Sequence, residues 1–547
     1  MSTARVRLFR DTYVDSVVQL SGTRAMRAID GVEWAAAAMA TPANLDTLTE
    51  QGFDPQDWSG GGAGDLVMAV RASSGEVAER AEQAGRAAIF ERRGSDSGSG
   101  WGPSDESGTE QPPRTLRDAM DRAPDSNVAV ISVPGDYVAL EAHQALSAGL
   151  DVLLFSDNVP LAAEVELKQR AERLGRLVMG PGAGTAMLGG TCLGFANVTT
   201  PGPVAVVAAA GTGAQEAMSL LDRWGVGVSH VIGLGGRDLS TDVGGTMARS
   251  ALRALAHDER TEVVLLVSKP PSPEVAHAVL TSMPPGKPLI AALLGLPGGM
   301  DSPDGVTLAS TLEAGAVATL AALGRQAPDP AAGLRERVAG VIAGLPEQRR
   351  LLRGLFSGGT LCYESLVILS EYFSGPLGPV YSNTPLDSTF RDFGASGASG
   401  ASGASGAFEA FGLPAPAGSH ICLDLGEEEY TKGRPHPMID PEARIELLRA
   451  HGSDPDVAVI ILDVVLGYGA HHDPAGQLAP VCAEVTADGG PRVVVYVLGT
   501  EGDPQGFDAQ RRAFTDAGCV VTETAARASL AAAAIATRDP ELVQARL

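Results

Sequence analysis

The sequence is short of basic residues, aromatic residues and long apolar runs. Its 66 aspartates and glutamates outnumber its 41 lysines and arginines, for a formal net charge of −25, and no basic stripe is present. This argues against a nucleic-acid partner, because such partners are bound through clustered lysines and arginines. Apolar runs such as residues 204–210 and 457–462 are too short to cross a bilayer, so no membrane-spanning helix is predicted.

Cysteine is also scarce. The five cysteines are Cys192, Cys362, Cys422, Cys482 and Cys519. Their odd number and wide spacing give no metal-binding pair and predict free thiols, mostly buried, in a reducing cytoplasm. The first 14 residues carry arginines but no continuous apolar core, so no secretory signal is predicted and we expect a cytoplasmic protein.

Several common catalytic and metal-binding motifs are missing as well. The chain has no Walker lysine motif, no nucleophile elbow and no Cys-x-x-Cys pair. The run His471-His472-Asp473 suggests a metal site, but adjacent histidines cannot easily face one ion, and no fourth ligand is nearby. A solvated loop is favoured there, and no metal site is predicted.

What the chain has in quantity is small apolar residues and glycine. Hydrophobic residues make up 44% while aromatic residues make up only 5%, and there are 67 glycines, a balance typical of parallel α/β units with tight turns. The 547 residues have room for roughly three or four domains of about 150 residues.

Part of the chain is duplicated. Gly211-Thr212-Gly213-Ala214-Gln215-Glu216 returns as Gly359-Thr360-Leu361-Cys362-Tyr363-Glu364. Three further landmarks follow in the same order in both copies: a glycine turn after a strand (231–236 and 421–426), a buried strand (263–267 and 457–462) and another strand (288–294 and 493–498). A repeated order of this kind predicts two copies of one α/β domain.

We therefore predict an α/β protein with an N-terminal α+β domain, a Rossmann-like domain and two flavodoxin-like domains. The expected boundaries are 1–92 for the α+β domain, 93–114 for a flexible linker, 115–200 for the Rossmann-like domain, 203–325 for the first flavodoxin-like domain and 350–547 for the second, with a disordered insertion at 394–407. Strands are expected at 6–9, 32–39, 65–70, 128–133, 151–155 and 177–179, and helices at 15–28 and 74–91.

Two glycine turns are candidate anion sites. Gly211-Thr212-Gly213 follows a strand and opens a helix, where backbone amides and the helix dipole can hold a phosphate or carboxylate. Gly358-Gly359-Thr360 repeats the arrangement. The alternative is that these glycines only allow the chain to turn. Lys269, in Ser268-Lys269-Pro270-Pro271, comes at the end of a predicted parallel strand, where open α/β sheets bind ligands.

Other segments bring charged groups to turns. Gly235-Gly236-Arg237-Asp238 places a cation and a carboxylate on a glycine-rich loop, and residues 433–440 hold Arg434, His436 and a carboxylate between prolines that restrict the backbone. Both segments could instead be solvated surface turns. The turn at 498–504 also lies between a strand and a helix, but its acidic residues Glu501 and Asp503 argue against anion binding there.

With these segments in order, the chain resembles the FdrA family along nearly its whole length, and more distantly succinyl-CoA synthetase. Val133-Pro134, Asp157-Asn158-Val159-Pro160, Gly180-Pro181, Gly211-Thr212 and Gly235-Gly236 look like the α subunit of that enzyme, and the part after about Gly354 resembles the ligase domain of its β subunit. Residues 41–44, 233–238, 268–271 and 433–440 look specifically like FdrA.

The resemblance to the synthetase fails at its chemistry. That family uses a phosphorylated histidine oriented by a glutamate, whereas here no histidine occurs between His277 and His420, and Ser268-Lys269 stands in the place of the glutamate. An ATP-grasp domain is also missing from the pattern. FdrA proteins are instead implicated in oxamate carbamoyltransferase activity together with partner subunits, a reaction that needs anion clamps rather than a phosphohistidine.

The resemblance implies the following site residues. Lys269, Arg434 and His436 are expected to be catalytic; Gly211, Thr212, Gly213, Gly235, Gly236, Arg237, Asp238, Gly358, Gly359 and Thr360 to bind substrate or phosphate; and Val133, Pro134, Tyr137, Asn158 and Pro160 to bind CoA if that cofactor is used. The expected substrates are carbamoyl phosphate and a small carboxylate, with partner subunits or a homo-oligomer as the assembly.

Two departures from the FdrA pattern, at three residues, concern polar groups. Gly182-Ala183 replaces the usual Asp-Cys, and Ala210 replaces a serine, so polar groups are missing from turns that are expected to face ligands. Two alternatives to a carbamoyl transferase subunit therefore stay open: an acyl-CoA synthetase that works with a partner, and a non-catalytic assembly or regulatory subunit.

Overall fold

The structure is a computed structural model of the chain. It describes residues 2–14, 16–91, 113, 115–296, 300–374, 377–391, 416, 418–431 and 435–547. The described residues form two compact units, one of residues 1–112 with 428–439 and one of residues 113–427 with 440–547. The predicted insertion at 394–407, and the predicted linker except for residue 113, lie outside the described residues.

The first unit is built on a three-stranded antiparallel sheet in the order β1-β3-β2. Its elements are β1 (Thr3–Phe9), α1 (Ser16–Arg27), β2 (Val32–Met39), α2 (Pro42–Glu50), β3 (Leu66–Ala72), α3 (Gly75–Arg86) and, from the second segment, α14 (Glu428–Thr431). Apolar side chains fill both faces of the sheet, with Met26 and Met68 in one core and Phe53 and Trp58 in the other. The predicted strands and the two predicted helices are confirmed.

Helix α2 is not among the predicted elements. Its sequence is largely polar, so it shows no clear apolar periodicity, but it carries a start signal in Thr41 and Pro42. The Thr41 hydroxyl caps the helix by accepting a hydrogen bond from the Asn44 amide, and Pro42 stands where a helical amide has no partner.

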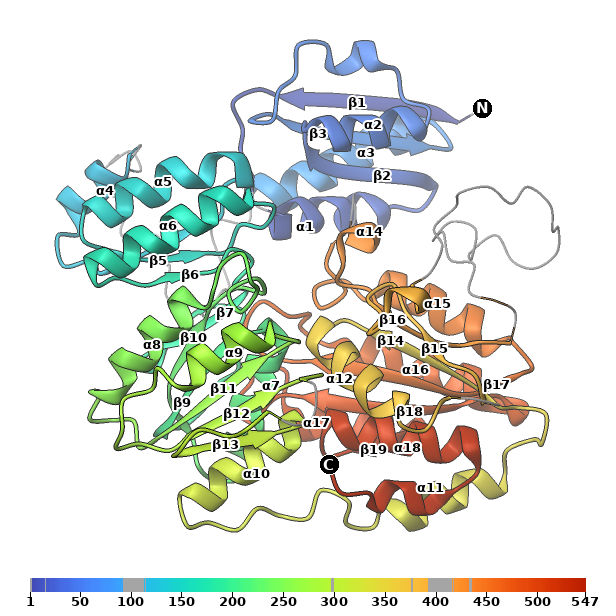
Figure 1. Cartoon of the computed structure of the whole chain (residues 1–547). Coiled ribbons are helices and arrows are strands. Elements are labelled where there is room, and N and C mark those ends of the chain that lie inside the picture. The colour runs from blue at the N-terminus through green and yellow to red at the C-terminus, as the bar shows by residue number, and fades with distance from the viewer. Residues whose placement is uncertain are drawn as a thin grey trace. The chain divides into compact units, whose positions relative to one another are not determined.

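The second unit contains two large sheets with the same topology (Figure 1). The first has the order β13-β12-β11-β9-β10-β7-β8 and the second β15-β16-β14-β17-β18-β19. Numbered within each repeat, five parallel strands run 2-1-3-4-5, the flavodoxin-like order, so the predicted duplication and fold class are confirmed. The strands are β9 (Pro201–Ala209), β10 (Val228–Gly233), β11 (Val263–Ser268), β12 (Leu289–Leu293) and β13 (Val306–Ala309), matched by β14 (Leu351–Phe356), β16 (His420–Asp424), β17 (Val457–Val465), β18 (Arg492–Leu498) and β19 (Val520–Thr522), with β15 (Val380–Tyr381) at the edge.

Helices connect most of the strands in both repeats. They are α7 (Gly211–Arg223), α8 (Thr246–Ala256), α9 (Pro273–Leu280) and α10 (Leu312–Ala322), then α11 (Leu334–Ala343), α12 (Gly359–Ser370), α15 (Glu442–Gly452), α16 (Pro474–Thr486), α17 (Phe507–Asp516) and α18 (Ala525–Thr537). Helix α18 is buried on all sides from Ala525 to Ala536, which its alanines permit because they let neighbouring backbones approach closely.

A third, three-stranded parallel sheet, β4-β5-β6, carries the Rossmann-like pattern. It consists of α4 (Leu116–Arg122), β4 (Val128–Ile131), α5 (Gly135–Ser147), β5 (Asp151–Leu154), α6 (Leu161–Leu174) and β6 (Val178–Met179). The hairpin of β7 (Thr185–Leu188) and β8 (Thr191–Gly194) was not predicted, and β7 pairs antiparallel with β10, so it extends the first large sheet.

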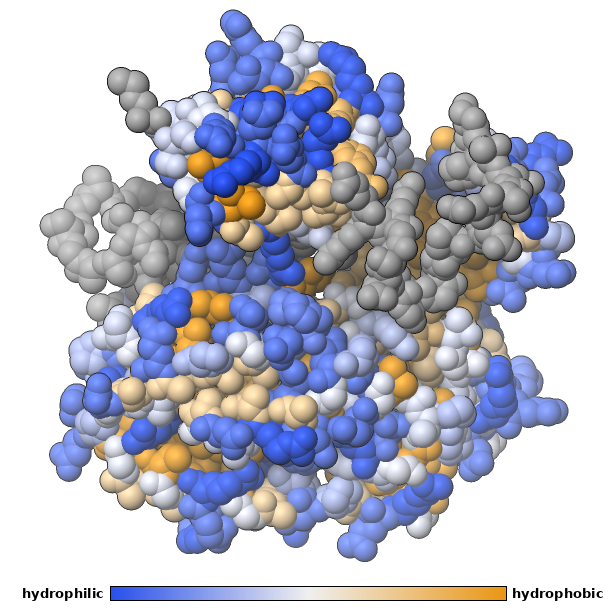
Figure 2. Space-filling view, turned by 180° about the vertical axis from the view of Figure 1, so that it is seen from behind, coloured by the Kyte–Doolittle hydropathy of each residue, from blue (hydrophilic) through white to orange (hydrophobic). Residues whose placement is uncertain are grey.

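The surface is mixed in character. On the face drawn in Figure 2, hydrophilic residues are interspersed with apolar patches. No helix in the described ranges combines the length and the apolar character that a membrane crossing needs.

Candidate functional site

The first turns of α7 and α12 meet. Thr212 Oγ1 accepts a hydrogen bond from the Thr360 amide at 3.3 Å, and a Cβ on Gly213 would lie 2.8 Å from the Thr360 methyl group. Neither helix has a side-chain cap, and within the described ranges the Gly211, Gly213 and Gly359 amides have no hydrogen-bond acceptor. Two helix N-termini with open amides therefore face the same place, an arrangement suited to an anion.

Lys269 adds a cation to this place. It follows β11 directly and is half-buried. A Cβ on Gly359 would lie 2.9 Å from Lys269 Nζ and closer still to Asp424 Oδ2. In the part of the chain that the structure describes, the Lys269 ammonium has no hydrogen-bond or ion-pair partner. We call Gly211–Gly213, Gly358–Thr360, Lys269 and Asp424 the twin-helix site; it unites seven of the sequence-predicted residues.

Asp424 is not among the residues predicted from the sequence; it ends β16 and is 2% exposed. The Asn383 side chain makes two hydrogen bonds with the Asp424 backbone, at 2.8 and 2.9 Å. The Oδ1 atom of Asp424 accepts a hydrogen bond from the Gly426 amide at 3.0 Å. Burial raises the pKa of Asp424 to about 7, against the opposing effect of the positive charge of Lys269. A signal was present, because the aspartate lies within the segment 421–426 that was predicted as a glycine turn after a strand.

A second buried aspartate supports the start of α12. The carboxylate of Asp463, in β17, accepts hydrogen bonds from the Ser357 and Gly358 amides, both at 2.7 Å, and pairs with Arg444 at 3.2 Å. The amides of Ser357 and Gly358 are thus used internally, and that of Thr360 by Thr212, while the Gly359 amide has no acceptor among the described residues.

Two glutamates at equivalent places in the repeat lie behind the twin-helix site. Glu364 of α12 accepts from the Leu312 amide at the start of α10, at 2.6 Å, and Glu216 of α7 binds the Ala525 amide at the start of α18 and the Tyr496 hydroxyl. Each repeat thus supplies a carboxyl group to a helix start of the other. Burial raises the pKa of Glu216 to about 7 and that of Glu364 to about 8.

We expect Glu364→Gln to reduce the pH dependence of stability. The folded-state pKa of Glu364 is about 8, above the unfolded value of 4.5. The protonated carboxyl group therefore contributes its full stabilisation below pH 4.5, and this contribution is lost as the pH rises from 4.5 to about 8. One such group changes the free energy of unfolding by about 1.4 kcal/mol per pH unit. Denaturant unfolding across that window should show a shallower fall for Glu364→Gln, whose amide oxygen still accepts from Leu312, than for the wild type. Glu371→Gln, exposed at the end of the same helix, should behave like the wild type, and equal slopes for all three proteins would disprove the expectation.

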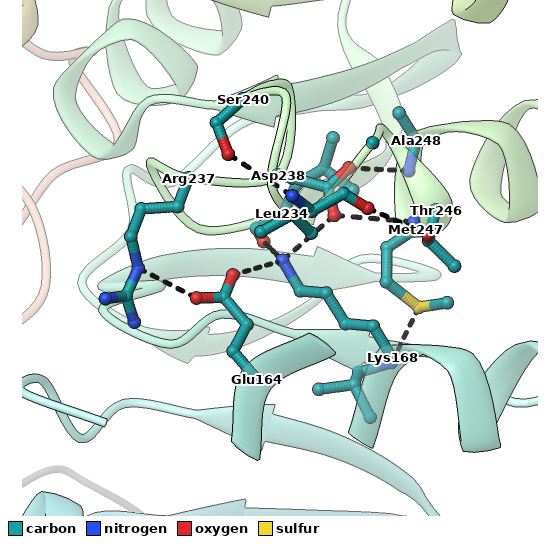
Figure 3. A network of polar contacts seen from close by, with 12 residues as sticks. Glu164, Lys168, Leu234, Arg237, Asp238, Ser240, Thr246, Met247 and Ala248 are labelled. Carbon is teal, nitrogen blue, oxygen red and sulfur yellow. Dashed lines mark hydrogen bonds and ion pairs between the residues drawn. The ribbon is translucent and has the colours of Figure 1, made fainter. Parts of the chain in front are cut away.

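The loop at 235–238 belongs to a different cluster (Figure 3). Lys168, wholly buried in α6, donates to Glu164 at 2.8 Å and to Asp238 at 2.9 Å. Asp238 also accepts from the Ala248 amide at 3.0 Å, and Arg237 pairs with Glu164 at 2.8 Å. The prediction that Asp238 faces substrate on a surface loop is wrong, because a buried lysine far away in the sequence holds its carboxylate inside the protein.

The neighbouring Gly235 lets this loop pack closely against the segment at Pro181. Gly235 has a φ of +81°, and a Cβ there would lie 2.5 Å from the Pro181 carbonyl oxygen. The Arg237 guanidinium also donates to the Val159 carbonyl at 2.8 Å. Gly235, Arg237 and Asp238 thus join the first flavodoxin-like repeat to the Rossmann-like sheet, whereas a Cβ on Gly236 would meet open space.

The residues expected to bind CoA gather at the carboxyl ends of β4 and β5. Pro134 precedes α5 and Pro160 precedes α6, and neither helix start has a side-chain cap. A Cβ on Gly135 would lie 2.6 Å from the backbone carbonyl carbon of Asn158, whose φ is +57°. Val133 precedes Pro134, and Tyr137 is 63% exposed in the first turn of α5. The two open helix starts could hold phosphate groups of a nucleotide such as CoA.

Two predicted catalytic residues, Arg434 and His436, lie outside the unit that holds the twin-helix site. Arg434 lies outside the described residues. His436 belongs to the first unit, where its Nδ1 accepts from the Met438 amide at 3.2 Å and Arg24 donates to the Ile439 carbonyl at 3.1 Å. Its assignment as a catalytic residue stays a prediction.

Other expectations concern metals and thiols. Four of the five cysteines are buried and Cys192 is half-buried, as predicted. Asp473, in the His-His-Asp run, caps α16, and Asp503 accepts from the Thr500 and Val198 amides, so neither carboxylate is a free ligand. The described residues contain no group of three or more His, Cys, Asp or Glu arranged for a metal ion.

Comparison with known proteins agrees with this architecture. Residues 355–535 match the CoA-ligase family and residues 1–104 match the AllF heavy metal-associated domain. Protein YahF of Escherichia coli K12, which is uncharacterized, is 36% identical over 540 residues, which are 95% of this chain and 96% of YahF. A succinate–CoA ligase α subunit of Archaeoglobus fulgidus is 30% identical over 182 residues, 32% of this chain and 61% of that subunit.

Among solved structures, a dinucleotide-forming acetyl-coenzyme A synthetase of Ca. Korarchaeum cryptofilum, in complex with phosphate and ADP, aligns with a TM-score of 0.25 and 16% identity over 76% of this chain and 84% of that one. The fold and the matched families define an acyl-CoA-ligase-like protein. Within that class, the chain belongs to the FdrA family.

The name of the matched N-terminal domain implies a heavy metal, and the residues do not fit one. Soft metal ions are held by thiolates and imidazoles, but the first histidine of the chain is His143 and the first cysteine is Cys192. The matched residues 1–104 therefore hold neither a thiolate nor an imidazole for such an ion.

Proposed function

We propose that the chain is a carbamoyl-transferring subunit that uses carbamoyl phosphate and a small acid amide such as oxamate, without a phosphohistidine. The observation that carries the proposal is the meeting of the Lys269 ammonium, which has no hydrogen-bond or ion-pair partner among the described residues, with the starts of α7 and α12 at the twin-helix site. Backbone amides and a cation there would neutralise both the departing phosphate and the oxyanion that develops on the carbamoyl carbon. The proposed location is the cytoplasm.

The absence of a phosphocarrier from the sequence supports this choice. No histidine lies between His277 and His420, so the chain offers no phosphohistidine in the region where its distant relatives are expected to carry one. Carbamoyl phosphate brings its own activated carbonyl group, so the transfer needs positioning and charge stabilisation rather than a covalent phosphoenzyme.

A second candidate is acyl-CoA ligase activity with a partner subunit that supplies nucleotide. The observation that favours it is the pair of uncapped helix starts after Pro134 and Pro160. The Archaeoglobus relative is itself named as one subunit of a ligase, which makes partner subunits a reasonable expectation here.

Calorimetric titration of the purified chain tests both candidates. Carbamoyl phosphate should bind, and addition of oxamate with the products of neighbouring genes should yield phosphate. Binding of CoA without binding of carbamoyl phosphate would replace the first proposal by the second. If neither compound binds, alone or with partners, a non-catalytic assembly role is left.

A further inference from the structure

One carboxyl group at the twin-helix site has an oxygen that faces the site and receives no hydrogen bond from the described residues. Asp424 Oδ1 accepts from Gly426, but within the described residues Asp424 Oδ2 has no hydrogen-bond donor. This oxygen is directed at Gly359, the first residue of α12, on the side where Lys269 Nζ also lies. The Asp424 side chain is only 2% exposed, and a carboxylate in such a place is costly when one of its oxygens has no donor, so the site favours a neutral carboxyl group or a ligand that supplies a partner.

The charges around Asp424 come from several elements. Lys269, after β11, favours the ionised carboxylate, whereas Glu427, after β16, and Asp463, on β17, disfavour it, and the Cys362 thiol lies on α12 close by. Burial outweighs the single cation, and it raises the pKa of Asp424 to about 7. Near neutral pH the group is therefore divided between an acid that can donate a hydrogen bond and a carboxylate that would repel an anion.

We propose that Asp424 is the proton-holding catalytic residue of the twin-helix site: its neutral form donates a hydrogen bond to the bound phosphate group, and anion binding is accompanied by proton uptake. This inference rests on the proposed function. Helix amides and Lys269 supply donors from two sides, and the Asp424 hydroxyl supplies one from the third, next to Gly359.

The proton has a defined path in carbamoyl transfer. The bond between the carbamoyl carbon and the phosphate oxygen breaks, a bond from that carbon to the amide nitrogen of the acceptor forms, and the nitrogen must lose one proton. Neutral Asp424 gives its proton to the departing phosphate, and the resulting carboxylate takes the proton from the nitrogen. Asp424 then returns to its starting form, and no other reactant is needed.

The test uses sulfate, which keeps its charge throughout the neutral range, and the full chain. Calorimetry at about pH 8, in two buffers with different ionisation enthalpies, should reveal uptake of close to one proton per sulfate bound by the wild type. The dissociation constant should rise by up to about tenfold per pH unit above neutrality. Asp424→Asn, which keeps the shape and a hydrogen-bond donor, should bind sulfate with an affinity that no longer changes with pH.

The titrations distinguish a failure of the role of Asp424 from a failure of the proposed function. Glu427→Gln removes a neighbouring charge but leaves Asp424 in place, so it should keep the proton uptake of the wild type. Proton uptake that persists in Asp424→Asn, or wild-type binding of sulfate without proton uptake, would overturn the role of Asp424 while leaving the twin-helix site intact. If neither sulfate nor carbamoyl phosphate binds at any pH, the proposed function falls and the inference falls with it. The wild-type proton count needs no variant, so a misfolded Asp424→Asn would not prevent a decision.

Discussion

Replacing Lys168 by alanine should lower the free energy of unfolding by about 3–5 kcal/mol, because it leaves two buried carboxylates without their shared cation. Lys168 is wholly buried and donates to Glu164, Asp238 and the Leu234 carbonyl oxygen, at 2.8, 2.9 and 2.9 Å (Figure 3). Arg237 would still pair with Glu164, but among the described residues Asp238 has no other cation. Denaturant unfolding followed by circular dichroism would measure the loss.

An ion pair between helices α6 and α8 offers a matched control. Arg253 of α8 pairs with Glu172 of α6 at 2.8 Å, but the two side chains are 46% and 36% exposed. Arg253→Ala should therefore cost less than about 1 kcal/mol, since solvent screens an exposed pair. Adding Asp238→Asn to a Lys168→Met variant should recover part of the loss, because the asparagine oxygen can still accept from Ala248. Equal losses for Lys168→Ala and Arg253→Ala would contradict the buried-network interpretation.

Replacing Lys269 by alanine should weaken binding of carbamoyl phosphate by about 10- to 100-fold, the usual range for losing a hydrogen bond to a charged group. The chain should unfold at an unchanged denaturant concentration, because within the described residues the ammonium makes no hydrogen bond or ion pair that stabilises the fold. Calorimetric titration and denaturant unfolding of the same preparations would measure the two effects together.

Lys287 provides the comparison for Lys269. It lies just before β12, at the amino end of the same sheet, and its ammonium donates to the Leu255 carbonyl oxygen at 2.8 Å. Lys287→Ala should lose some stability and keep its affinity for carbamoyl phosphate, the reverse of Lys269→Ala. Undiminished binding by Lys269→Ala would remove this residue from the proposed chemistry.

The twin-helix site could be predicted in part. The repeated glycine turns indicated two helix starts, and the position of Lys269 after a parallel strand indicated a ligand-facing residue. Asp424 could not be predicted, because a single aspartate at a strand end does not stand out when the chain holds 66 acidic residues. Asp238 was assigned to a surface loop, because nothing near it in the sequence reveals that Lys168 is its buried partner.

By itself, the sequence determined the α/β class, the duplication and the order of the strands, because those features depend on local apolar periodicity and on glycine turns that recur at matching places. Only the tertiary structure decided which charged groups share one environment. Lys269 and Asp424 lie on different repeats and meet at Gly359, whereas Lys168 and Asp238 meet in the interior. The reason is physical: the cost of burying a charge depends on what surrounds it in space, and the partners that offset the cost are far apart along the chain.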